Sequence, residues 1–75
     1  MTEKKVYNED GDLLVLNCPV CGNLAFPYEG SFRVCPTCGW IDDYVQKEEP
    51  DEDYCANFMS LNQARKAWKE GRPIE

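Results

Sequence analysis

Two copies of one short phrase, Cys-Pro-x-Cys-Gly, begin at Cys18 and Cys35. The two residues between the cysteines of each pair let both thiols turn toward one point, and the flanking proline and glycine favour the tight turn this requires. Four thiolates gathered by such turns make a closed tetrahedral site, which favours zinc, with iron as the main competitor. We predict one structural Zn²⁺ ion held by Cys18, Cys21, Cys35 and Cys38, and iron stays an open alternative.

A redox dithiol and a pair of disulfides are the competing interpretations of these cysteines. A thioredoxin-like dithiol needs a βαβ surround and a helix N-terminus that lowers the thiol pKa, whereas glycine follows each pair here. Disulfides belong to oxidising compartments. The sequence lacks a secretory leader and any apolar stretch long enough to cross a membrane. We therefore expect a cytoplasmic protein that does not enter membranes and keeps its thiols reduced.

The fifth cysteine, Cys55, follows an acidic segment and has no second cysteine close by in the sequence. A buried small hydrophobe is the usual role of such a residue, and a reactive or regulatory thiol is the alternative. The chain contains no histidine. Since the sequence also shows no nucleophile beside a base and no open metal position, catalysis is poorly supported, and we predict that the protein is not an enzyme.

The bulk composition limits the fold and the partners. A chain of 75 residues allows one small domain. A hydrophobic core of this size seldom holds a fold alone, and the metal ion would supply the additional cross-link. The formal net charge of −6 disfavours nucleic acid, because affinity for phosphates comes from lysine and arginine. The charge is unevenly distributed: residues 42–53 hold seven acids and one lysine, whereas residues 61–72 hold four bases and one acid.

The elements that must position the cysteines follow from apolar alternation and turn residues. Residues 13–17 form a short apolar run with strand character that leads into the first pair. Residues 24–28 and 31–34 alternate and are predicted to form a hairpin joined at residues 28–31, with a cysteine pair at each outer end. Residues 39–45 are the candidate third strand. Residues 46–54 are expected to be an acidic loop.

One helix is expected over about residues 60–70. Ser60 and Gln63 have the spacing of a capping box, in which each side chain bonds the other's backbone amide. Leu61 and Trp68 lie on one apolar face of this helix, which we expect to pack against the ribbon, and Gly71 ends it.

These elements predict a small metal-stapled α+β fold, with a zinc-ribbon-like β-hairpin or three-stranded antiparallel sheet and one C-terminal α-helix. Residues 1–11 are expected to be flexible or loosely ordered, residues 12–71 to form the zinc-binding domain, with its hairpin region over about residues 13–45, and residues 72–75 to be a tail. A monomer is the default expectation.

The sequence resembles the bacterial cysteine-rich CPCC domain family over about residues 16–70. Ile41 and Cys55 depart from the family pattern, which tends to have an acid and a glycine at those positions. The resemblance implies zinc ligation by the four paired cysteines and implies no established activity. Three blocks carry it: CPVCG at residues 18–22, CPTCGWIDDYVQ at residues 35–46, and CANFMSLNQAR at residues 55–65.

The remaining residues of these blocks have two interpretations. Trp40, Asp42, Asp43, Asn57 and Arg65 could support the fold through hydrogen bonds and ion pairs, or they could form a small polar pocket and binding surface. We predict a protein-interaction module of unknown process, with a protein partner. The alternatives are a zinc-ribbon protein that binds nucleic acid and a rubredoxin-like iron electron carrier.

Overall fold

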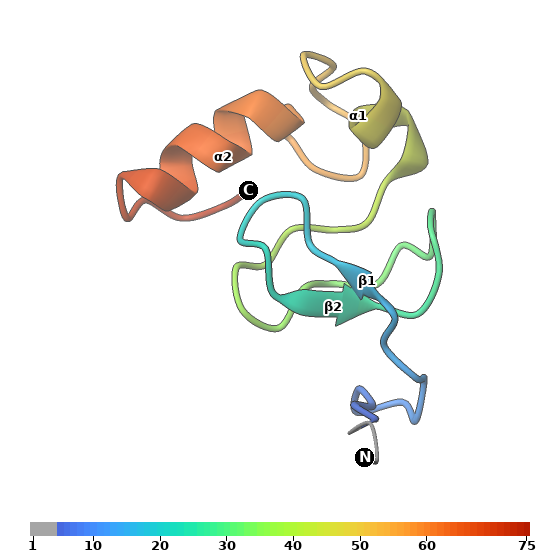
Figure 1. Ribbon diagram of the computed structural model, residues 1–75. Coiled ribbons are helices and arrows are strands. Elements are labelled where there is room, and N and C mark those ends of the chain that lie inside the picture. Colours follow the sequence, from blue (N-terminus) through green and yellow to red (C-terminus); the bar gives the residue numbers. More distant parts are fainter. Residues whose placement is uncertain (1–4) are drawn as a thin grey trace.

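The computed structural model describes residues 5–75 and shows a small α+β protein. Four elements follow one another along the chain: β1 (Leu16–Asn17), β2 (Leu24–Phe26), α1 (Tyr44–Glu48) and α2 (Leu61–Lys69). Figure 1 shows the two helices at one end of the molecule and the two strands beyond them, while the N-terminal segment extends away from the strands. The helices therefore lie on the opposite side of the strands from the N-terminus.

The two strands of the hairpin lie on either side of the first cysteine pair in the sequence. The prediction of a hairpin between the two cysteine pairs is therefore wrong. β1 and β2 are antiparallel, with Leu16 opposite Phe26 and Asn17 opposite Leu24, and the register shifts by a bulge between Leu16 and Asn17. The first Cys-Pro-x-Cys-Gly turn connects these two strands. Each strand is only two or three residues long, so the turn and its contacts do more to fix this region than the ladder does.

The predicted partner strand, residues 31–34, instead pairs with the residues that follow the second cysteine pair. Val34 forms an isolated bridge with Ile41, and the amide of Asp42 donates to the carbonyl of Arg33 at 3.0 Å. Within residues 5–75 the sheet has two strands, so the predicted three-stranded sheet is wrong. Phe32 has left-handed backbone, with φ of +57°, which interrupts the extended conformation that a continuous strand over residues 31–34 requires.

Helix α1 was not predicted, because Tyr44 and Val45 made this segment look like a strand. Asp43 begins the helix: its side chain accepts hydrogen bonds from the amides of Val45 and Gln46. The expected acidic loop is therefore wrong over its first three residues, which belong to α1. The acidic loop begins only at Glu49.

Helix α2 and its capping box agree with the prediction. The Ser60 hydroxyl accepts from the Gln63 amide, and the Gln63 side chain accepts from the Ser60 amide. Leu61, Ala64 and Ala67 are buried in α2. The predicted packing of Trp68 is wrong in part, since 40% of its surface is exposed.

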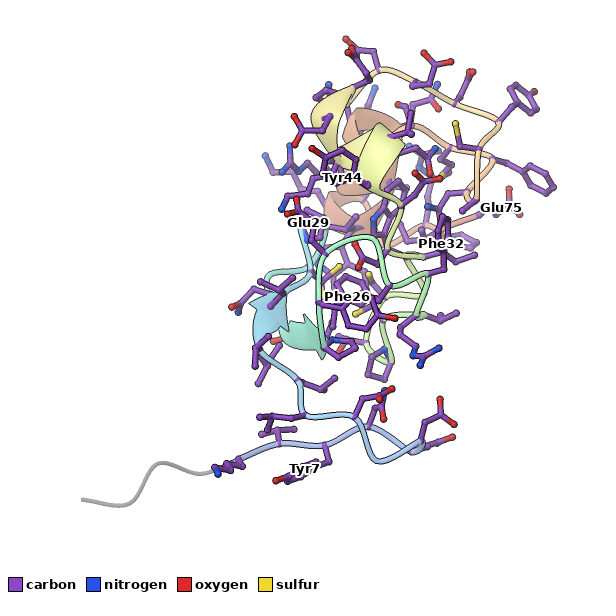
Figure 2. All side chains as sticks on the ribbon, turned by 90° about the vertical axis from the view of Figure 1, so that its right-hand side faces the viewer. Tyr7, Phe26, Glu29, Phe32, Tyr44 and Glu75 are labelled. Atoms are coloured by element: carbon purple, nitrogen blue, oxygen red, sulfur yellow. The ribbon has the colours of Figure 1, made fainter. Side chains whose placement is uncertain are left out.

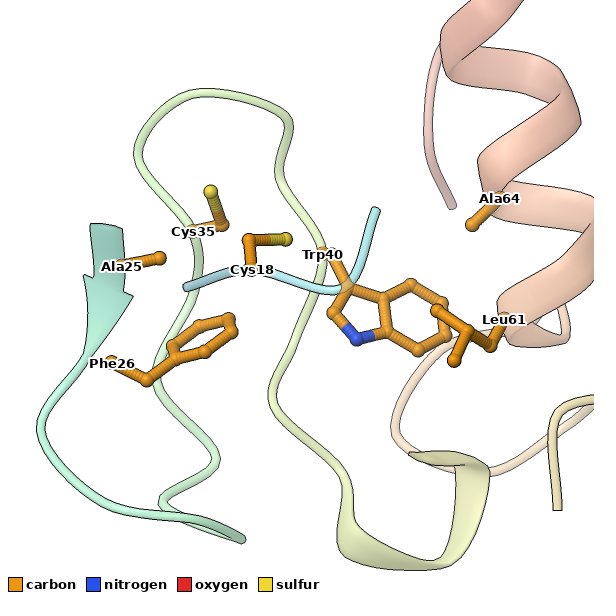
Figure 3. Close-up of a cluster of buried hydrophobic side chains, with 7 residues drawn as sticks. All are labelled: Cys18, Ala25, Phe26, Cys35, Trp40, Leu61 and Ala64. Atoms are coloured by element: carbon orange, nitrogen blue, oxygen red, sulfur yellow. The ribbon is translucent and has the colours of Figure 1, made fainter. Parts of the chain in front are cut away.

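The core lies between the cysteines and α2. Figure 3 shows the indole of Trp40 between Cys18 on one side and Leu61 and Ala64 of α2 on the other. Phe26 extends the same cluster from β2. Cys18 and Cys35 are two of the seven buried residues of this cluster, and Cys21 and Cys38 pack against it. A core this small is expected in a domain that a metal ion would cross-link.

The N-terminal segment forms a turn of its own in the described residues. Tyr7 bridges Leu13, and the Asn8 side chain accepts from the amides of Asp10 and Asp12. Residues 1–4 of the segment predicted to be loosely ordered lie outside the described residues. Within the described residues, no helix has the length and apolar character to cross a membrane.

Candidate metal centre and its surroundings

The two cysteine pairs fold into turns with the same backbone. In the first, the amide of Gly22 donates to the carbonyl of Cys18 at 2.9 Å, and in the second Gly39 donates to Cys35 at the same distance. Both glycines have left-handed backbone, with φ of +82° and +88°. An L-residue adopts this conformation at a cost, which explains why each phrase ends in glycine.

The turns bring four sulfur atoms together. The Sγ atoms of Cys18, Cys21, Cys35 and Cys38 all lie within 4.8 Å of one another. Cys18 and Cys38 are 3.5 Å apart, and Cys21 and Cys35 are 3.7 Å apart. A tetrahedral ion with Zn–S bonds of about 2.3 Å has sulfurs separated by about 3.8 Å. The observed spacing therefore fits four ligands of one ion and is far longer than a disulfide bond.

Burial and backbone amides act in opposite directions on these thiols. Burial raises the pKa of Cys18 to about 11, although the amides of Cys21 and Val20 oppose it. Burial also raises the pKa of Cys38. At Cys35 burial again favours the thiol, but the amides of Cys38 and Thr37 outweigh it and lower the pKa. The raised pKa values favour protonated thiols at Cys18 and Cys38 in the absence of a cation, and a bound divalent cation would displace these protons.

The four sulfur donors decide which metal ion this cluster suits. Two of its cysteines are buried and two are half-buried, so four sulfurs close around one point. Soft thiolates in tetrahedral geometry suit zinc or iron rather than magnesium or calcium, which prefer oxygen. The four cysteines therefore form a candidate site for one thiolate-binding metal ion.

Four of the five residues predicted for a binding surface are buried. Trp40, Asp42, Asp43 and Asn57 expose between 1% and 6% of their surface. Arg65 is exposed, and its Nε donates to the carbonyl of Pro19 at 2.8 Å rather than to an acid. The predicted pocket in which Arg65 meets these acids is not formed, so this surface prediction is wrong.

The two acids after Trp40 support the backbone. Asp42 Oδ2 accepts from the amide and the hydroxyl of Ser31, at 2.9 and 2.8 Å. Asp43 Oδ1 caps α1, and its Oδ2 accepts from the amide of Ala56 at 3.1 Å. Asp42 therefore fixes the entry to the second cysteine turn, and Asp43 ties α1 to the loop before α2.

Gln46 is the residue that sequence reasoning missed. It is fully buried, and its Nε2 lies within hydrogen-bond distance of the carbonyls of Glu52, Asn57 and Met59. Its Oε1 accepts from the amide and the side chain of Asn57, at 3.2 and 2.8 Å. Asn57 in turn exchanges hydrogen bonds with both backbone groups of Ile41.

The buried polar side chains form a satisfied network. Within residues 5–75 every buried side-chain nitrogen or oxygen has a hydrogen-bond partner. Such a network specifies one backbone arrangement and leaves no buried polar atom directed at a ligand. The signal available in the sequence was that Gln46 and Asn57 both lie in the blocks that carry the family resemblance.

The segment before α2 is the most exposed apolar part of the described chain. Tyr54 exposes 80% and Phe58 exposes 70% of their surfaces, and their ring centroids are 6.3 Å apart. Cys55 between them is exposed, so the expected buried role is wrong. Partial desolvation, followed by the charges of Asp43 and nearby acids, raises the pKa of Cys55, which argues against an activated thiol.

Comparison with family models matches residues 16–71 to the family described as Cysteine-rich CPCC. The match covers both cysteine turns, both helices and the buried network. No curated protein matches the chain.

Proposed function

The chain belongs to the cysteine-rich CPCC family, and on this basis we propose that it is a non-enzymatic protein-interaction module held together by one structural zinc ion. The observation that carries the proposal is the closed cluster of Cys18, Cys21, Cys35 and Cys38. A catalytic zinc site keeps one position for water or substrate, whereas four thiolates fill the tetrahedron. The proposed ion therefore stabilises the fold and leaves contact with a partner to the surface.

A protein partner is favoured over nucleic acid because several basic side chains are already engaged. Arg33 pairs with Asp12, Arg72 pairs with Glu70, and Arg65 donates to a backbone carbonyl. Phosphate contacts would have to replace these interactions against a net charge of −6. The net negative charge of the chain instead suits a protein partner with a basic surface.

Metal analysis tests the first half of the proposal. Native mass spectrometry of the purified chain should show the mass of one zinc ion, and the absorption spectrum should lack the visible bands of an iron–thiolate centre. Cys55→Ser should retain the ion, since this thiol lies outside the cluster. A coloured protein with one iron ion would instead support the electron-carrier alternative.

Affinity capture tests the second half. The zinc-loaded chain and Cys35→Ser are each immobilised and exposed to extract from the cells in which the chain occurs. Any captured protein is then purified and recombined with the chain. The proposal expects a complex that forms with the zinc-loaded chain, fails with the variant and weakens with added salt. Recovery of nucleic acid in place of protein would refute this assignment.

A further inference from the structure

We propose that residues 54–58 are the docking surface of this module, and that they bind a protein whose own surface has an apolar pocket rimmed by lysine and arginine. The inference rests on the proposed function, because it names where an interaction module makes its contact. Tyr54 and Phe58 together are termed the aromatic knob. The acidic residues of segment 48–53 border the aromatic knob along the chain.

The aromatic knob consists of the two most exposed large hydrophobic side chains in the described part of the chain. Single exposed apolar residues are common on protein surfaces, but these two rings lie against each other. The amide of Tyr54 donates to the carbonyl of Phe58 at 3.1 Å, which closes the turn and keeps the rings together. Aromatic residues contribute disproportionately to the centres of protein interfaces.

The backbone beneath the aromatic knob is fixed from inside the protein. Asp43 accepts a hydrogen bond from the amide of Ala56, and Gln46 accepts from the amide of Asn57. Both acceptors are buried: Asp43 is the N-cap of α1, and Gln46 lies within the helix. A turn held in this way loses little conformational entropy on binding, so the exposed rings are preorganised for contact.

The charge beside the aromatic knob selects the chemistry of the partner. Residues 48–53 contain five acids and no base, and the three acids closest to Tyr54 are exposed. An apolar surface bordered by negative charge complements an apolar pocket bordered by positive charge. The same charge repels nucleic acid and acidic membranes, and it would speed encounter with a basic protein.

Selection from short random peptides displayed on phage tests this surface with the zinc-loaded full chain. The selected peptides should combine aliphatic or aromatic residues with flanking lysine or arginine. Changing both Tyr54→Ser and Phe58→Ser should weaken their binding about tenfold or more. Tyr7→Ser and Phe32→Ser remove comparably exposed aromatic rings elsewhere on the chain (Figure 2), which are 55% and 62% exposed. These two substitutions should leave the affinity unchanged.

Alkylation of Cys55 gives a second measurement that needs no substitution. Because Cys55 lies within residues 54–58 and is exposed, a peptide bound on the aromatic knob should slow its reaction with a maleimide. Peptides that neither protect Cys55 nor lose affinity to the double variant would overturn the docking surface. If the affinity of the peptides falls with Phe32→Ser instead, the proposed interaction function is supported, but its docking surface lies at another site. A library that yields no binding peptide contradicts both proposals.

Discussion

Gln46→Ala is the most direct test of the buried network. The substitution removes a fully buried side chain and leaves the amide of Asn57 and the carbonyl of Met59 without the partners described above. A buried polar group that loses its partner costs about 1–3 kcal/mol. Two such groups predict a loss of about 2–6 kcal/mol in the free energy of unfolding. Domains of this size have about 4–11 kcal/mol in total, so the variant should fold with a small margin.

Urea unfolding at a fixed, buffered concentration of free zinc is the appropriate assay. Bound metal adds to the stability of the folded state, so the free concentration must be the same for each variant. Trp40 is 1% exposed and its fluorescence should report the transition. Gln46→Ala should lower the midpoint without changing the slope, since the surface exposed on unfolding stays similar.

Gln63→Ala is the matched control, because it removes an exposed glutamine whose side chain accepts one hydrogen bond, from the amide of Ser60 at the start of α2. It should cost about 1 kcal/mol or less. Asn57→Ala and the double variant with Gln46→Ala should be strongly non-additive, since the two side chains share a hydrogen bond of 2.8 Å. Equal losses for Gln46→Ala and Gln63→Ala would refute the role assigned to the buried network.

Three further predictions concern the metal centre and the N-terminal turn. Cys35→Ser should abolish metal binding and the dispersed amide spectrum of the folded chain, whereas Cys55→Ser should keep both, as measured by native mass and NMR. Gly39→Ala should reduce stability by about 1–2 kcal/mol through its φ of +88° alone, since an added Cβ meets nothing within 4 Å; an unchanged urea midpoint would contradict this. The side-chain hydrogen bond from Asn8 is the main cause that lowers the pKa of Asp12. Ionised Asp12 therefore stabilises the folded state at pH values above the ordinary pKa of an aspartate. This stabilisation is lost as the pH falls through the lowered pKa of Asp12 in the folded state. In Asn8→Ala the carboxyl titration of Asp12, followed by carbon-13 NMR, should therefore move to higher pH, and an unmoved titration would disprove the assignment.

The cysteine cluster could be predicted from the sequence because its determinants are local. Each Cys-Pro-x-Cys-Gly phrase carries its own turn geometry, including the glycine that takes the left-handed conformation. The capping box at Ser60 was equally predictable, since both partners lie within one turn of α2. Local hydrogen bonds of this kind depend little on the rest of the chain.

The strand pairing and α1 could not be predicted in the same way. Residues 31–34 alternate as a strand should, but the left-handed Phe32 turns the segment toward Ile41 instead of back along β2. Helix α1 is five residues long and depends on Asp43 and on contacts of Gln46 with residues six to thirteen positions further along the chain. Such long-range contacts leave no periodic pattern in a short segment.

The structure also changes what the family blocks mean for function. Trp40 fills the core between the cysteines and α2, and the polar residues that follow it are used within the fold. The segment that leaves the second cysteine turn runs through Trp40 and Ile41, and Asn57 exchanges hydrogen bonds with both backbone groups of Ile41. Metal binding at Cys35 and Cys38 would therefore fix the segment on which Asn57 depends. Because Asn57 lies within the turn of residues 54–58, the hydrogen bonds between Asn57 and Ile41 link this turn to the segment that follows the cysteine cluster.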